Sequence, residues 1–95
     1  MKIERKAAGR IELRLSDDPD QFDDIAELVR SRLSGRWTRQ LDGLDQSYWD
    51  LDVQGMIITV HREHYLGVLV VCDDDAPKRQ LLERLARIWE AATPK

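Results

Sequence analysis

Tyr48, Asp50, Thr59 and His61 are the residues whose types and spacing favour a shared chemical site. They alternate along two runs that flank the dipeptide at 54–55, which is typical of a two-residue hairpin turn. A turn at this dipeptide pairs residue 48 with 61 and residue 50 with 59, so that the four side chains lie on one face. Asp50 and His61 then become diagonal neighbours. A carboxylate beside an imidazole begins an acid–base pair, because it orients the ring and raises its pKa.

A binding surface is the simpler interpretation of the same residues, since polar and aromatic side chains commonly populate a sheet face that meets water. The binding residues that we expect on this surface are Tyr48, Asp50, Thr59, His61 and Tyr65. Trp37 is a further candidate, because a half-exposed tryptophan beside arginines resembles an interface anchor.

Other reactive residue types in the chain do not form a recognisable centre. The segment 61–64 (His-Arg-Glu-His) contains zinc-binding types, but zinc-protease motifs place two histidines on one helix face, whereas this segment straddles a turn between strands. Cys72 is expected at the opposite end of the hairpin from His61, roughly 20 Å away at ~3.3 Å per residue, so the two form no nucleophile–base pair. We therefore expect no catalytic residue, no metal site, no cofactor and no enzymatic activity.

Charges gather at the expected helix ends. Aspartates lie at 17–24 and 73–75, just before or at the start of each predicted helix, and four arginines lie within 30–39. Helix dipoles favour this arrangement. An arginine patch beside Trp37 would suit a nucleic acid, but no nucleic-acid-binding module is recognisable, so we do not expect such a partner.

The elements that must position these residues follow from hydrophobic periodicity. The sequence predicts strands at 11–15, 48–53, 56–61 and 65–71, a weaker strand at 37–41, and amphipathic helices at 19–33 and 77–92. Residues 49, 51, 53, 56, 58 and 60 are apolar and share one face of the central hairpin, which agrees with the turn at 54–55. The sequence allows two registers, one residue apart, between the strands at 56–62 and 65–71. Either Leu69, or both Val68 and Val70, would then lie with Ile57 on the face opposite the apolar one.

The predicted fold is an α+β two-layer sandwich with an antiparallel sheet of four or five strands, in the order β-α-β-β-β-β-α. Both helices have a single apolar stripe, so both are expected on one sheet face, which leaves the other uncovered. Residues 1–10 are expected to be a flexible arm, and residues 11–93 a single domain.

Composition restricts the class of protein. The 95 residues are 42% hydrophobic and 35% charged, with a net charge of −3 and one cysteine. A chain of this length buries roughly 65% of its unfolded surface, enough for one core. These values exclude a disordered acidic tail, and no apolar stretch approaches the length of a membrane span. The lone cysteine and the absence of a signal-peptide pattern point to the cytoplasm.

The segment Tyr48-Trp49-Asp50-Leu51-Asp52-Val53-Gln54-Gly55, followed by residues 59–67 (Thr-Val-His-Arg-Glu-His-Tyr-Leu-Gly), resembles small stand-alone bacterial proteins of uncharacterised function. Some of those families resemble immunity proteins, which bind and neutralise a toxin. The resemblance covers about residues 46–71, and it implies a bacterial protein that binds another protein.

Two functions remain open. The first is a small cytoplasmic interaction module, immunity- or adaptor-like. It would bind a protein partner through its uncovered sheet face, its sheet edge or its acidic helix starts, or form a homodimer through the uncovered sheet face. The second is a ligand- or metal-binding domain, conceivably an enzyme, centred on Tyr48, Asp50, Thr59 and His61.

Overall fold

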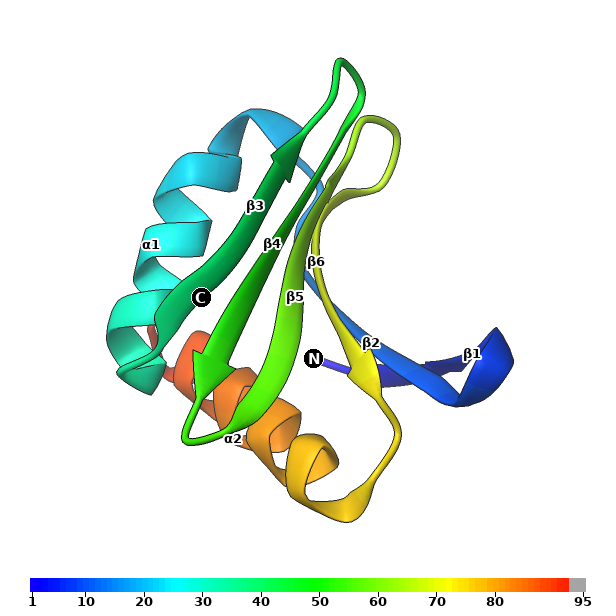
Figure 1. The fold of residues 1–95 in the computed structure, drawn as a ribbon. Helices are drawn as coiled ribbons and strands as arrows, with labels where there is room; N and C mark the ends of the chain where they lie inside the picture. Colours follow the sequence, from blue (N-terminus) through cyan, green and yellow to red (C-terminus); the bar gives the residue numbers. More distant parts are fainter. Residues whose placement is uncertain (93–95) are drawn as a thin grey trace.

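A computed structural model describes residues 1–92 of the chain, which contain six strands and two α-helices (Figure 1). In chain order the elements are β1 (Ile3–Lys6), the 3₁₀ turn η1 (Ala7–Gly9), β2 (Arg10–Ser16), the 3₁₀ turn η2 (Pro19–Gln21), α1 (Phe22–Leu33), β3 (Arg36–Asp42), β4 (Gln46–Val53), β5 (Met56–Glu63), β6 (Gly67–Asp73) and α2 (Ala76–Ala92). All strand pairs are antiparallel, in the spatial order β1-β2-β6-β5-β4-β3. The predicted sheet of four or five strands is therefore wrong.

The additional strand is β1, which lies within the segment expected to be a flexible arm. Its Ile3 pairs with Leu13 and packs partly against the core, whereas its other three side chains are exposed. A strand with one apolar residue has no alternating pattern for a sequence reading to detect, and charged residues are typical of an edge strand. The chain reverses into β2 through left-handed backbone at Ala8 and Gly9, with φ of 63° and 68°. The weaker strand expected at 37–41 forms β3, the opposite edge of the sheet.

The central hairpin has the register that its apolar pattern predicts. Residue 53 pairs with 56, 51 with 58 and 49 with 60, and 48 lies opposite 61. Gln54 and Gly55 both have positive φ, 54° and 86°, as a type I′ turn requires. Asp52 stabilises the turn, because its Oδ1 accepts a hydrogen bond of 2.7 Å from the Gly55 amide. Between β5 and β6, His61 pairs with Leu69, which places Leu69 rather than Val68 and Val70 on the face of His61.

The core lies between the sheet and both helices, which pack on the same side of the sheet (Figure 1). The residues of α1 that are buried form a single apolar stripe, as expected: Phe22, Ile25, Ala26, Val29 and Leu33. Those of α2 are Leu81, Leu82, Leu85 and Ala86, with Ile88 and Trp89 partly buried. Asp75 caps α2 by accepting a 3.0 Å hydrogen bond from the Lys78 amide. Neither helix is long and apolar enough to cross a membrane, within the residues described.

Candidate functional site

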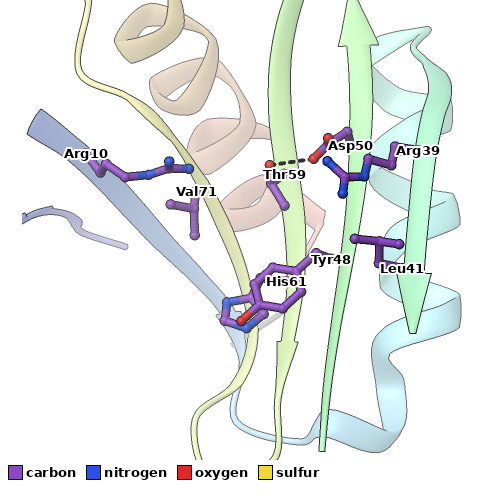
Figure 2. Close-up of a pocket in the computed structure, with 8 residues that line it drawn as sticks. All are labelled: Arg10, Arg39, Leu41, Tyr48, Asp50, Thr59, His61 and Val71. Atoms are coloured by element: carbon purple, nitrogen blue, oxygen red, sulfur yellow. Dashed lines mark hydrogen bonds between the residues drawn. The ribbon is translucent and has the colours of Figure 1, made fainter. Parts of the chain in front are cut away.

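The sheet face opposite the helices is hollowed by a depression of about 420 Å³, which we call the face pocket (Figure 2). Its lining residues are Arg10, Arg39, Leu41, Tyr48, Asp50, Thr59, His61 and Val71. They come from all the strands except β1, so segments far apart in the sequence meet only because the sheet forms.

Strand register arranges most of these side chains in two rows across the sheet. Leu41, Tyr48 and His61 occupy successive paired positions on β3, β4 and β5, and this first row continues through Leu69 of β6 to Arg14 of β2. The second row comprises Arg39, Asp50, Thr59 and Val71. It continues to Glu12 of β2, whose carboxylate lies 3.7 Å from Nζ of Lys6. The rows are two residues apart along the strands, a spacing of about 6.6 Å. The pocket thus has an aromatic and apolar half beside a polar half.

Tyr48 and His61 form the floor of the aromatic half. Their rings are stacked, with centroids 4.3 Å apart and planes inclined by 16°. The Tyr48 hydroxyl donates a hydrogen bond to Oε1 of Gln46, whose Nε2 donates in turn to Glu63 over 2.8 Å. These contacts fix the tyrosine ring over the imidazole, while 41% of the residue stays exposed.

His61 has an unusual environment beneath this tyrosine. Its Nε2 is buried and has no hydrogen-bond partner among residues 1–92. Burial lowers the pKa of His61 below its ordinary value of about 6.5, while the nearby carboxylates of Glu63 and Glu12 act in the opposite direction. The imidazole is therefore neutral at pH 7, and it supports the ring above it without adding charge.

Asp50 does not form the acid–base pair with His61 that the diagonal register allowed. Its Oδ1 accepts a hydrogen bond of 2.8 Å from the Thr59 hydroxyl, which lies directly opposite on β5 (Figure 2). The aspartate is thus oriented by a hydroxyl, and the histidine has no carboxylate partner in hydrogen-bond contact.

Two arginines reach toward the pocket from opposite sides, Arg10 from β2 and Arg39 from β3 (Figure 2). Neither side chain forms an ion pair or a hydrogen bond within the described part of the chain, whereas Arg30 pairs with Glu27 and Arg79 with Asp74. The two arginines outnumber the single aspartate of the lining. The lining side chains therefore carry one net positive charge, although the whole chain has a net charge of −3. Glu12 and Glu63 lie outside the lining but close enough to act on His61.

Four of the six expected binding residues meet in the face pocket, namely Tyr48, Asp50, Thr59 and His61. Trp37 does not, because it packs edge-on against Trp49, at 5.3 Å between centroids, beside the core on the helix side. Tyr65 is also outside the pocket. It lies in the loop between β5 and β6, where 87% of it is exposed, and its ring contacts that of His64.

The residues that the sequence analysis missed are Arg10, Arg39, Leu41 and Val71. Arg10 falls within the segment expected to be an arm, although it lies an even number of residues from Arg14 and so shares its face of the strand. Extending that strand by one residue would have put it on the uncovered face. Arg39 and Leu41 are two residues apart on β3 and therefore share one face of it. The hydrophobic pattern of this strand is too weak to assign it to the sheet from the sequence.

The remaining reactive types do not converge. No group of three or more histidine, cysteine, aspartate or glutamate side chains among the described residues is arranged to hold a metal ion. Cys72 is buried on the helix side of β6, and burial raises the pKa of its thiol to about 11. The thiol is protonated at neutral pH, which makes it a packing group and not a nucleophile.

The fold and the site together define a small antiparallel α+β sandwich with a pocket on its open face. The chain belongs to the family described as "Protein of unknown function (DUF3630)", whose model matches residues 2–89. No curated protein and no solved structure matches the chain. The family match includes all the strands that line the pocket.

Proposed function

We propose that this protein is a binding module that holds a small anionic ligand in the face pocket without transforming it. The observation that carries the proposal is the pair of arginines, Arg10 and Arg39, which flank a hollow and have no ion-pair partner among the described residues. A guanidinium matches the geometry of carboxylate and phosphate groups and binds them through paired hydrogen bonds.

Inorganic phosphate is the simplest probe for this proposal. We expect a phosphate titration at constant ionic strength to shift the backbone amide resonances of Thr59, His61 and Val71 in a saturable way. Arg39→Gln and Arg10→Gln should each weaken binding by about tenfold or more, since a hydrogen bond to a charged group contributes a net ~1.5–3 kcal/mol and about 1.4 kcal/mol corresponds to a factor of ten. Arg32→Gln is the matched control, because Arg32 is exposed on α1. Equal effects of all three variants, or no saturable shift, would refute the proposal.

A protein partner is the second candidate, and one observation outside the pocket favours it. Leu44 and Tyr65 are 97% and 87% exposed on neighbouring loops, which a 3.1 Å hydrogen bond from the His64 amide to the Asp45 carbonyl joins (Figure 1). Exposed apolar residues on a fixed loop pair are typical of an interaction site. A bacterial, immunity-like or adaptor-like role in the cytoplasm, which the resemblance over residues 46–71 implies, belongs to this candidate.

Self-association through these loops is the form of the second candidate that is directly testable. Sedimentation velocity at increasing concentration should then show a dimer that Leu44→Asp dissociates, while Leu28→Asp, a control at an exposed position of α1, leaves the dimer intact. A monomer at every concentration would remove the homodimer and leave a different protein as the only partner in this candidate.

A further inference from the structure

We infer that the anionic ligand of the face pocket also carries a flat aromatic or heteroaromatic ring, and that this ring stacks on the outer face of Tyr48. The inference rests on the proposed function, because it names the ligand class of the same pocket. Two features of the site beyond its charge lead to it: the way the tyrosine is mounted and the spacing of the two rows.

Tyr48 is mounted as a platform. Its inner face is stacked on His61, and its hydroxyl is held by Gln46, so the orientation of the ring is determined before a ligand arrives. A platform that is already fixed loses little conformational freedom on binding. Its outer face is open, since 41% of the residue is exposed. A flat ring placed there would continue the stack that the imidazole begins.

Leu41 gives the platform an apolar wall. It pairs with Tyr48 across β3 and β4, lines the pocket and is 47% exposed. A leucine this exposed beside an open aromatic face loses apolar contact with water when a ring covers it, which favours binding. A purely inorganic anion would leave the Tyr48 ring face and the Leu41 side chain exposed to water.

The distance between the rows matches the two parts of such a ligand. A ring above Tyr48 places its anionic substituent toward the row of Asp50 and Thr59, about 6.6 Å along the strands. In Figure 2, Arg39 lies beside Asp50 on one side of this row, and Arg10 extends over Val71 on the other. The Asp50 carboxylate faces Thr59 in a hydrogen bond, and two guanidiniums offset its charge.

The size of the pocket also agrees with a compact ringed anion. About 420 Å³ lies in the range of small-molecule sites, roughly 300–1,000 Å³. A second hollow of about 390 Å³ shares Arg10, Asp50 and Thr59 with the first and extends to Lys78 at the start of α2. Lys78 is paired with Asp75 at 2.8 Å, and Asp73 also lines this second hollow. A substituent on the anionic side of the ligand therefore has room to continue into it, without a further unpaired cation among its described lining residues to bind.

Pairs of probes that differ only in the ring test the inference by NMR titration. Benzoate is compared with acetate, and phenyl phosphate with inorganic phosphate, while benzamide serves as the neutral ring. We expect each ringed anion to bind about tenfold more tightly than its ringless counterpart, the gain that one aromatic stack supplies. Benzamide should bind more weakly than benzoate. The tighter of the two ringed anions identifies the ligand's acid as a carboxylate or a phosphate.

Three variants assign the gain to the platform. Tyr48→Leu should abolish the difference between ringed and ringless probes. Tyr48→Phe should keep the difference, because it retains the ring. Tyr65→Leu is the matched control, since it removes an exposed tyrosine outside the pocket. Well-dispersed amide spectra of each variant establish that the fold is retained.

The outcomes separate this inference from the proposed function. If ringed and ringless anions bind the pocket equally well, or if Tyr48→Leu keeps the tenfold gain, the inference of an aromatic ring on the ligand is wrong. The proposed anion-binding function is unaffected by either result. If no anion shifts the pocket resonances, both fall. If benzamide binds as well as benzoate, a ring is bound but the proposed anionic function is wrong.

Discussion

His61 is a residue whose protonation the fold opposes. Its folded-state pKa lies below the ordinary value because burial penalises the imidazolium, and the unfolded chain titrates near 6.5. Between these two values the unfolded state binds more protons than the folded state. The free energy of unfolding therefore rises with pH through this window and falls as the solution is acidified below about pH 6.5.

Urea unfolding at pH 7.5 and pH 5.5 measures this contribution. We expect the wild-type protein to be less stable at pH 5.5, and His61→Gln to lose less stability over the same interval because glutamine does not titrate. Wild-type stability that increases on acidification would contradict the assigned direction of the pKa.

Cys72 shows the same effect of burial on an acid. With a thiol pKa of about 11, two units above its unperturbed value of 9.0, its thiolate fraction at pH 8 is about 100-fold below that of a free thiol. We expect Ellman's reagent to modify the native protein at least 100-fold more slowly than the urea-unfolded chain. Equal rates in the two states would show that the thiol is neither buried nor perturbed.

At the scale of elements, alanine substitutions at Gly55 and Gly67 can be compared. Both would reduce stability because the backbone is left-handed, but only the substitution at Gly67 would also cause a steric clash. Both glycines have positive φ, 86° and 102°. A Cβ at Gly55 would meet nothing within 4 Å, whereas a Cβ at Gly67 would lie 2.0 Å from the Ser16 carbonyl oxygen, where β6 begins beside the end of β2. Gly55→Ala should therefore cost about 1 kcal/mol of stability. Gly67→Ala should cost more than about 3 kcal/mol or prevent folding. Chemical denaturation of both variants makes the comparison, and similar losses would contradict it.

The elements also show how far the sequence could lead. The β4–β5 register was predictable because the turn at 54–55 and six apolar residues require the same pairing, so each observation constrains the other. This register placed Tyr48, Asp50, Thr59 and His61 on one face correctly. The two edge strands have no comparable pair of turn and apolar pattern from which a register could be predicted. β1 buries only part of Ile3, and β3 is mostly exposed and contains a bulge between Trp37 and Arg39.

The two pocket arginines escape prediction for different reasons. Arg10 is the first residue of β2, one position before the predicted start of that strand at residue 11. Arg39 belongs to the edge strand β3, whose place beside β4 depends on long-range pairing that no local pattern states. The contact between Asp50 and His61 failed for a related reason. Register determines which residues are neighbours, but it does not determine which neighbour forms a hydrogen bond with Asp50. Thr59 lies directly opposite Asp50, and its hydroxyl takes the place of the diagonal His61.

At the scale of the whole molecule, one core joins every layer. The buried apolar residues of the sheet and of both helices form a single cluster, and the radius of gyration is 12.2 Å, close to about 12 Å for a compact chain of this length. We therefore expect cooperative two-state unfolding. Tryptophan fluorescence, which reports on Trp37, Trp49 and Trp89, should change at the same urea concentration as far-UV circular dichroism. Separate midpoints would show that the β3–β4 hairpin or α2 unfolds independently.

The alternation along β5 has an evolutionary consequence. Ile58 and Val60 are fully buried beneath the helices, while Thr59 and His61, their immediate neighbours in the chain, line the pocket. Under the proposed function, selection for folding and selection for ligand choice act on different residues of the same strand. Substitutions at outward residues such as Leu41 and Val71 are then expected to change which ligand is bound and to leave the interior unchanged.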